Sequence, residues 1–134
     1  MEVIARLFGI SLEDIGPLSL EVPEKPPQLG SSCVVFAKSE ALRMIRNGTP
    51  RNTVLAAYCD ALVNRILLLL HRVEIKEELV ITGGIAKNTG IVQRIEKSLG
   101  IQARICFEPQ IVGALGAAII ANKLFQEDGG KSGK

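Results

Sequence analysis

Two glycine-containing segments in the last third of the chain have residue types that suit a ligand-binding site. In the first, Thr82, Gly83 and Gly84 follow the apolar run from Leu79 to Ile81, which predicts a buried strand that ends in a glycine turn. Glycines at the carboxyl end of a strand allow a sharp turn, remove side chains that would block a ligand and leave backbone N–H groups near the next helix. Ligands of open α/β sheets bind at that end of the strands. On its own, this pattern is more typical of an ordinary tight turn.

The second segment runs from Glu108 to Ala118 and predicts a helix of small residues. Gly113 and Gly116 lie inside it, where a glycine costs about 1 kcal/mol relative to alanine, so a packing or ligand constraint is expected. One interpretation is that the helix packs on a sheet. The other places the start of the helix against a nucleotide held by the turn at Gly83 and Gly84. The order and spacing of the two segments favour the second, so we predict that they line a shallow pocket.

The elements around these segments predict an α/β fold that is mostly helical. After the glycine turn, Asn88 or Thr89 can cap a helix that reaches Leu99, where Gly100 stops it. Apolar and polar residues then alternate from Ile101 to Phe107, as in a strand, and a helix from Ile111 to Phe125 follows. Strand, helix, strand and helix at these lengths indicate two parallel strands joined by a right-handed crossover.

The first half of the chain is predicted to be helical with one long connection. Helical spacing predicts a helix from Met1 to Phe8, and prolines between Leu18 and Gly30 predict an extended surface loop. The apolar run from Cys33 to Phe36 is either a strand or the lead into a helix that extends from Ser39 to Arg46. Thr49 and Pro50 predict the start of a helix that continues to about Val73 and is apolar on more than one face.

Composition and charge exclude several classes of protein. The 134 residues suit one domain, and 47% of them are hydrophobic, which is enough for a core. The 16 basic and 14 acidic residues are too balanced to indicate nucleic-acid binding. No signal peptide is visible, and the longest apolar run, Ile66 to Leu70, is far shorter than the roughly 20 residues of a membrane span. Three cysteines without tight spacing do not form a disulfide framework. We therefore predict a cytoplasmic protein that binds neither nucleic acid nor a membrane.

Three segments resemble one family. The segment TGGIAKN (residues 82–88), followed by a helix, a strand and the GALGAA helix, is similar to the adenosine-binding end of the ATPases related to actin, sugar kinases and heat-shock chaperones. The segment SSCVVFAKSE (residues 31–40) resembles one in the activators of 2-hydroxyglutaryl-CoA dehydratase and the ATP-binding subunits of benzoyl-CoA reductase. The opening residues, Glu2 to Leu7, resemble the stretch that leads to it. The resemblance implies the C-terminal, adenosine-side subdomain of an actin-like (ribonuclease H-like) ATPase fold without its first strands in residues 1–126. Residues 127–134 are expected to form a disordered tail.

The resemblance also implies an activity and a set of cofactors. Members of the family are expected to form homodimers that share a [4Fe-4S] cluster and to use ATP hydrolysis with Mg²⁺ to pass electrons to a 2-hydroxyacyl-CoA dehydratase or benzoyl-CoA reductase component. By motif, Cys33 matches one of the two cluster cysteines that each subunit supplies. Gly83 and Gly84 match the adenosine turn, and Gly113 lies in the helix that closes that site. We expect the other cysteine, the phosphate loops and the magnesium ligands in an N-terminal part that this sequence lacks.

Two further questions are left open by the residues. Two copies of Cys33 give half of the four thiolates that a cluster normally needs, unless Cys59 or Cys106 is recruited. The apolar helical face around Cys59 predicts a buried thiol, whereas Cys33 is expected at the surface. No catalytic residue is predicted, so whether this chain alone is an enzyme stays open. The alternative function is a non-catalytic dimerisation or partner-docking module that uses the leucine-rich helix.

Overall fold

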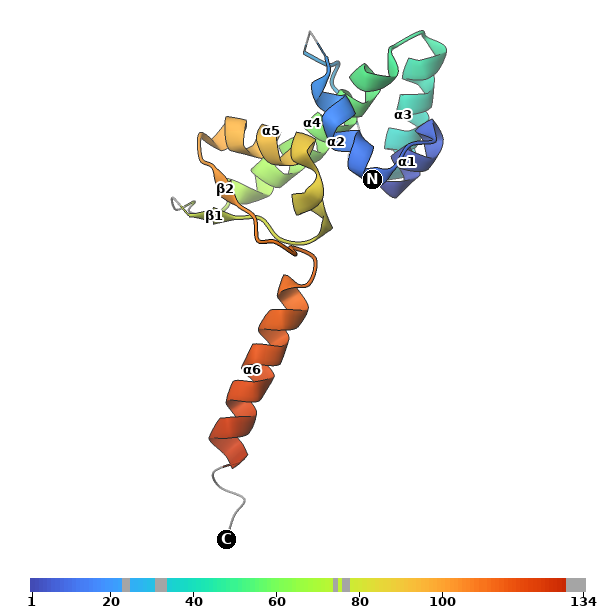
Figure 1. Cartoon of the computed structure of the whole chain (residues 1–134). Coiled ribbons are helices and arrows are strands. Elements are labelled where there is room, and N and C mark those ends of the chain that lie inside the picture. Colours follow the sequence, from blue (N-terminus) through green and yellow to red (C-terminus); the bar gives the residue numbers. More distant parts are fainter. Residues whose placement is uncertain (23–24, 31–33, 74, 76–77, 130–134) are drawn as a thin grey trace.

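The computed structural model describes residues 1–22, 25–30, 34–73, 75 and 78–129. In chain order, the elements of these residues are α1 (Glu2–Phe8), α2 (Leu12–Leu20), α3 (Val34–Arg46), α4 (Arg51–Leu70), β1 (Leu79–Val80), the 3-10 helix η1 (Gly84–Lys87), α5 (Thr89–Leu99), β2 (Ala103–Arg104) and α6 (Val112–Gly129). Figure 1 shows α1 to α5 and the two strands gathered into one body, from which α6 extends alone. The mostly helical α/β fold that the sequence predicts is confirmed.

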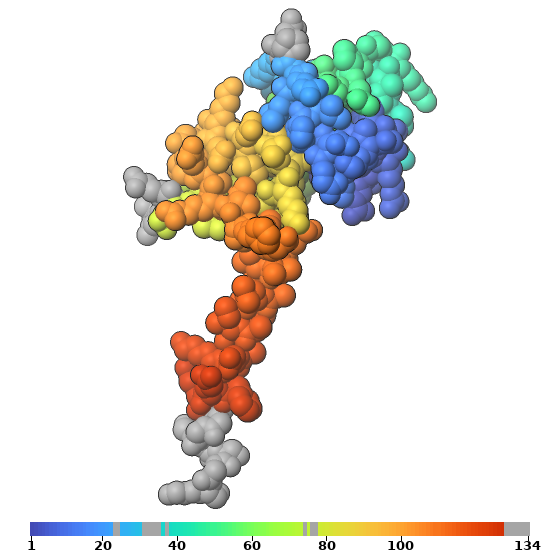
Figure 2. Space-filling model, viewed as in Figure 1, coloured from blue at the N-terminus to red at the C-terminus, as the bar shows by residue number. Residues whose placement is uncertain are grey.

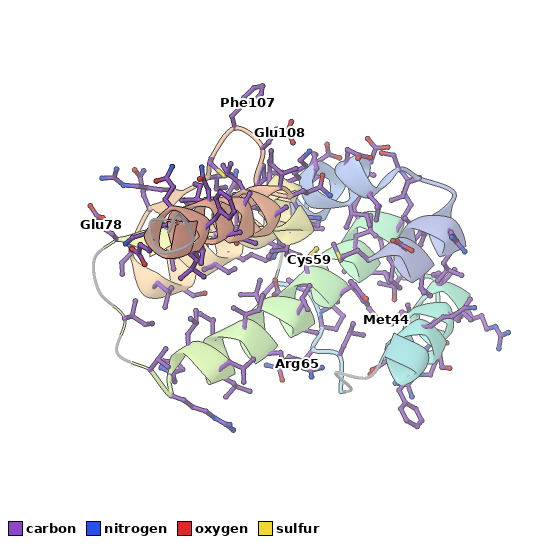
Figure 3. The ribbon with its side chains drawn as sticks, turned by 90° about the horizontal axis from the view of Figure 1, so that it is seen from below. Met44, Cys59, Arg65, Glu78, Phe107 and Glu108 are labelled. Atoms are coloured by element: carbon purple, nitrogen blue, oxygen red, sulfur yellow. The ribbon has the colours of Figure 1, made fainter. Side chains whose placement is uncertain are left out.

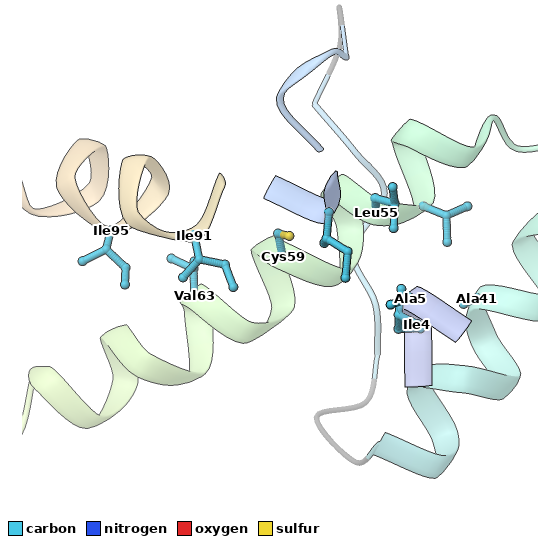
Figure 4. Close-up of a cluster of buried hydrophobic side chains, with 10 residues drawn as sticks. Ile4, Ala5, Ala41, Leu55, Cys59, Val63, Ile91 and Ile95 are labelled. Atoms are coloured by element: carbon cyan, nitrogen blue, oxygen red, sulfur yellow. The ribbon is translucent and has the colours of Figure 1, made fainter. Parts of the chain in front are cut away.

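The core lies where α1, α2, α3 and α5 meet the long helix α4 (Figure 4). Its main buried side chains are Ile4, Ala5, Ile15, Ala41, Val54, Leu55, Cys59, Val63, Ile91 and Ile95. Among the described residues, α4 is long and apolar enough to cross a membrane by length and composition. A core helix of a folded domain meets the same criteria, and α4 contributes Val54, Leu55, Cys59 and Val63 to this core.

Helix α2 crosses α5 at very short range because both helices have a glycine at the crossing. A Cβ atom built on Gly90 would lie 2.4 Å from the Ser19 hydroxyl oxygen and 2.7 Å from the Gly16 carbonyl oxygen. The sequence prediction of a loop from Leu18 onward is wrong at its start, since α2 continues to Leu20. A capping box at Ser11 begins this helix and offsets the proline inside it.

Arg94 ties the carboxyl end of α2 to α4 and α5. Its guanidinium group donates hydrogen bonds to the carbonyl oxygens of Ser19, at 2.7 Å, and Gly90, at 2.8 Å. It also donates to the Ser19 hydroxyl, at 3.1 Å, and forms an ion pair with Asp60 on α4. A cation at the end of a helix satisfies its last carbonyls and suits the negative end of the helix dipole. The Arg94 side chain therefore links α2, α4 and α5 to one another.

Replacing Arg94 with methionine should lower the free energy of unfolding by about 2 kcal/mol, because hydrogen bonds to a charged group are lost and their buried acceptors are left unpaired. The Arg94 side chain is only 15% exposed, so water cannot replace these contacts freely. The matched control is Arg104→Met, since the Arg104 side chain is 76% exposed in a surface pair with Glu78. Urea unfolding should show a change within about 0.5 kcal/mol for this control. Equal effects of the two substitutions would contradict the role given to Arg94.

The sheet consists of β1 and β2, which pair in parallel with Leu79 opposite Ala103 and Val80 opposite Arg104. The predicted parallel pair is confirmed, although β2 is much shorter than the predicted strand from Ile101 to Phe107. Alternation alone does not form a strand, because each residue also needs a neighbouring strand to pair with. Two strands form a small sheet, and only helix cover makes such a pair stable.

Several helix ends lie close to the predicted positions. Helix α5 is capped by the Asn88 side chain and ends at the left-handed Gly100, as predicted. The run after Cys33 is resolved as the beginning of α3 rather than a strand. Helix α6 continues to Gly129, so residues 127–129, expected in the tail, are helical. Residues 126–128 contain neither glycine nor proline, so the first residue after Phe125 that disfavours a helix is Gly129.

Candidate functional site

The turn after β1 brings the two glycine-containing segments side by side. The N–H group of Gly83 donates a hydrogen bond to the carbonyl oxygen of Pro109 at 2.7 Å. Gly83 has a φ of 81°, a left-handed backbone conformation that glycine adopts without strain. Gly84 then starts η1, which leads directly into α5. The predicted turn at the end of the strand is therefore present, and it lies next to the residues that precede α6.

The residues across from the turn are Glu108, Pro109 and Gln110. Pro109 is buried, which fixes the backbone of this connection against the turn. A Cβ atom on Gly84 would lie 3.5 Å from the Gln110 side-chain nitrogen, an ordinary contact distance. Lys87 forms a 3.3 Å ion pair with Glu108, and both side chains are about half exposed. The turn therefore has a polar, open side bordered by Gln110 and this ion pair.

The backbone of the turn offers hydrogen-bond donors. The N–H groups of Gly84 and Ile85 precede the first hydrogen bond of η1, from the Ala86 N–H to the Gly83 carbonyl. Neither group donates to a backbone carbonyl of the described residues. A polar ligand that lies over Gly84 would meet these donors and no side chain of the turn itself. The sequence analysis included Lys87, Glu108 and Gln110 in its two segments but gave these side chains no role, since polar residues in a connection carry no periodic signal.

Gly113 is not enclosed by the described residues. A Cβ atom on Gly113 or Gly116 would meet no atom within 4 Å. Helix α6 points away from the sheet (Figure 1), so among the described residues it does not pack on the sheet, as one interpretation of the sequence had it. The structure brings Gly83 and Gly84 to the residues just before α6, while the first turn of α6 itself stays open. Figure 3 shows Phe107 and Glu108 projecting outward from the loop that carries them.

The cysteines differ in their surroundings. Cys59 is fully buried in the core, as predicted, and burial raises the pKa of its thiol. Cys106 is exposed. Cys33 lies outside the described residues, so the surface position expected for Cys33 stays a prediction. Within the described ranges, no group of three or more His, Cys, Asp or Glu side chains could hold a metal ion. Cys59 therefore does not fit the role of an additional cluster ligand at a surface.

Thiol labelling should separate Cys59 from Cys106. At pH 8 the exposed Cys106 should react with a disulfide reagent within seconds to minutes, and Cys59 at least about a hundredfold more slowly. The reason is that only the thiolate reacts, and burial disfavours that form of Cys59 while it also blocks the reagent. Peptide mapping by mass spectrometry after timed quenching measures both rates, and denatured protein provides the control in which they converge. Rapid native labelling of Cys59 would show that the core around α4 opens readily.

A concave region of the structure lies apart from the glycine turn. It is an open cavity of about 1050 Å³ between α2, α4, α5 and the connection after α2. Its lining includes Lys25, Asp60, Arg94 and Lys97. The guanidinium group of Arg94 is already occupied by Ser19, Gly90 and Asp60. We therefore attribute this cavity to the packing of α2, α4 and α5 against one another.

Comparisons with known proteins identify relatives. A family model, the BadF/BadG/BcrA/BcrD ATPase family, matches residues 1–121. The chain is 32% identical over 127 residues to the activator of lactoyl-CoA dehydratase from Anaerotignum propionicum, covering 95% of this chain and 49% of that protein. The activator of the 2-hydroxyisocaproyl-CoA dehydratase from Clostridium difficile, solved with bound ADPNP, is 25% identical with a TM-score of 0.85, covering 99% of this chain and 49% of that one. For component A of the Acidaminococcus fermentans (R)-2-hydroxyglutaryl-CoA dehydratase, the identity is 31%, the TM-score 0.80, and the coverage 89% and 46%.

The solved relatives agree with the arrangement of the elements. The chain spans about half the length of these relatives, and its fold corresponds to that part of the actin-like ATPase activators. Since the family model covers most of the chain, from the first helix into α6, the assignment does not depend on one motif. The chain belongs to the BadF/BadG/BcrA/BcrD ATPase family.

Proposed function

We propose that this chain provides the adenosine side of a nucleotide-binding site, formed by Gly83, Gly84 and the residues that lead into α6 up to Gly113. The observation that carries the proposal is the 2.7 Å hydrogen bond from Gly83 to Pro109, which joins the two segments in one place. The bound ADPNP in a solved relative supports a nucleotide as the ligand. Gly84 leaves room for the flat face of a base or a ribose, and the free N–H groups suit polar ligand atoms.

Isothermal titration calorimetry with ADP tests the proposal. The chain should bind one ADP per copy, with an affinity weaker than that of a complete two-sided site, because one wall alone buries only part of the ligand. Inorganic phosphate and a nucleotide without adenine serve as controls for non-specific charge effects. The absence of measurable ADP binding, in a chain that circular dichroism shows to be folded, would contradict the proposal.

We place this site in an activator that uses ATP hydrolysis to drive electron transfer to a 2-hydroxyacyl-CoA dehydratase or benzoyl-CoA reductase component. The relatives' names support a partner of this kind. The step that this chain contributes is nucleotide binding. The Mg²⁺ ligands and phosphate donors that hydrolysis requires are expected outside the described residues, so no hydrolytic step is assigned to these side chains. A cytoplasmic location and independence of nucleic acid and membrane belong to the same proposal.

We also propose that Cys33 is the ligand through which two copies share an iron–sulfur cluster. The support is the SSCVVFAKSE segment, together with the burial of Cys59, which leaves Cys33 and Cys106 as the available thiols. Two copies of Cys33 supply only two thiolates, so iron and sulfide are added anaerobically together with a small thiol that can provide the other two. Cys33→Ser should then abolish the visible absorbance of a cluster, and Cys106→Ser should retain it. Sedimentation equilibrium should then give twice the 14.4 kDa chain mass for the loaded protein. The same absorbance in both variants would contradict the assignment of Cys33.

A second function, partner docking, is supported by a different observation. The sequence suggested the leucine-rich helix, α4, as a docking element, and its carboxyl-terminal half does expose Leu68 and Leu69. The more extensive exposed apolar surface belongs to α6.

A further inference from the structure

One ion pair links the two segments that form the candidate site. The Lys87 ammonium group lies 3.3 Å from a Glu108 carboxylate oxygen, although the two residues are 21 positions apart in the sequence. Lys87 is the last residue of η1, and Glu108 belongs to the connection between β2 and α6. The pair therefore joins the segment that leads into α5 to the segment that leads into α6.

A backbone hydrogen bond joins the same two segments. The Gly83 N–H group donates to the Pro109 carbonyl oxygen at 2.7 Å, and Pro109 directly follows Glu108. Figure 2 shows the two segments against each other on the visible face, next to the point where α6 leaves the body. The hydrogen bond and the ion pair together set the separation between the turn and the connection.

Both ends of the ion pair are carried by backbone that is held in place. Lys87 lies between Ala86 and Asn88, which are both buried, and the Asn88 side chain caps α5. On the other side, Glu108 directly precedes the buried Pro109. An exposed ion pair usually contributes little, because ordering two long side chains costs entropy and water screens the charges. Fixed backbone at both ends lowers the first of these two costs for the pair of Lys87 with Glu108.

The connection that the pair holds also carries Gln110. A Cβ atom built on Gly84 would lie 3.5 Å from the Gln110 side-chain nitrogen, so this amide borders the space over the turn. A binding site gains affinity when its groups are held in place before the ligand arrives, because less freedom is lost on binding. We propose that Lys87 and Glu108 form a positioning pair, which keeps the turn and the connection at the separation that a nucleoside diphosphate requires. The inference rests on the proposed nucleotide site, whose two segments the pair holds together.

Replacing either residue should weaken ADP binding about threefold, the size of effect expected from one half-exposed ion pair. Isothermal titration calorimetry compares the full wild-type chain with Lys87→Met, Glu108→Gln and the double variant. The double variant should also lose about threefold rather than ninefold, because the two residues act through one contact. Exchanging the charges, with Lys87→Glu and Glu108→Lys in one chain, should restore most of the wild-type affinity.

Salt and a second ion pair provide the controls. In about 1 M NaCl the wild-type chain and the single variants should bind ADP equally, because salt screens an exposed pair. Glu78 and Arg104 form a comparable pair at 3.4 Å, with side chains 77% and 76% exposed. Glu78 precedes β1, whereas the glycine turn follows that strand. Glu78→Gln should therefore retain the wild-type affinity for ADP.

Hydrogen exchange of the Gly83 amide tests the pair without any nucleotide. This amide is protected while its hydrogen bond to the Pro109 carbonyl holds the two segments together. Lys87→Met and Glu108→Gln should each raise its exchange rate about threefold in NMR spectra of the full chain. Glu78→Gln should leave the rate unchanged.

The two measurements separate the positioning role from the nucleotide site itself. Wild-type exchange of the Gly83 amide in the Lys87 and Glu108 variants would overturn the proposal, and so would faster exchange without any loss of ADP affinity. A loss confined to Lys87→Met, without rescue by the exchanged charges, would assign Lys87 to direct contact with the ligand instead. If the wild-type chain binds no ADP, the proposed nucleotide site fails, and the exchange rates alone decide whether the pair holds the segments together.

Discussion

Replacing Gly90 with alanine should lower the free energy of unfolding by about 2 kcal/mol, the usual range for overpacking a tight contact. The added methyl group would lie 2.4 Å from the Ser19 hydroxyl oxygen and 2.7 Å from the Gly16 carbonyl oxygen. The hydroxyl could rotate, but the carbonyl belongs to the backbone of α2, so the helices must move apart. That movement also disturbs Arg94, whose guanidinium group binds both Ser19 and Gly90. A fall in Tm of roughly 8 °C is expected for a chain of this size.

The matched control is Gly116→Ala in α6. No atom lies within 4 Å of its added Cβ, and alanine favours a helix by about 1 kcal/mol over glycine. This substitution should therefore leave the unfolding midpoint unchanged or raise it. Urea unfolding followed by circular dichroism measures both variants under one set of conditions. If Gly90→Ala is as stable as Gly116→Ala, the close crossing of α2 and α5 is not present in solution.

Replacing Gly84 with valine should weaken ADP binding at least tenfold, while the fold stays intact. Gly84 is exposed, and a Cβ atom there makes only an ordinary contact with Gln110, so the body of the protein tolerates the change. The branched side chain would instead occupy the space over the turn where the nucleotide is proposed to lie. It would also separate the ligand from the N–H groups of Gly84 and Ile85. A tenfold loss corresponds to about 1.4 kcal/mol of binding free energy.

The control for this substitution is Gly30→Val, because Gly30 is also exposed and lies far from the turn in the sequence. Its added Cβ atom would lie 3.7 Å from the nearest atom, a Glu40 carboxylate oxygen. Calorimetric titration with ADP should give the wild-type affinity for Gly30→Val. Equal affinities of the Gly84 and Gly30 variants would remove the turn from the nucleotide site, even if the wild-type chain binds ADP elsewhere.

Local signals in the sequence predicted the elements that have defined ends. Helix α5 has an apolar face, an asparagine cap at Asn88 and a glycine stop at Gly100, and all three are present in the structure. The strand before Gly83 and its parallel partner were also predictable, because apolar runs of this length that alternate with a helix form parallel pairs. The family, as well, could be predicted from the motifs, and the comparisons confirm it.

Features that depend on contacts between distant residues could not be predicted in the same way. Helix α2 contains Gly16 and Pro17, which weaken a helix locally, and its stability comes from the Ser11 capping box and from Arg94, 75 residues beyond Ser19. The sequence of α6 correctly indicated a constraint on its glycines, but their partner is absent from the described contacts. The spacing of small residues in a helix indicates that the helix packs closely, but it does not identify the element or ligand that packs against it.

Nitrogen-15 NMR of the full chain during titration with ADP tests the central claim most directly. The amide signals of Gly83, Gly84 and Ile85 should shift with a single saturable dissociation constant, and those of Gln110 and Gly113 should shift with the same constant. Signals of α3, at the other end of the body, should stay in place. Saturable shifts confined to the cavity around Arg94, or no shifts at the glycine turn at saturating ADP, would contradict the placement of a nucleotide site there.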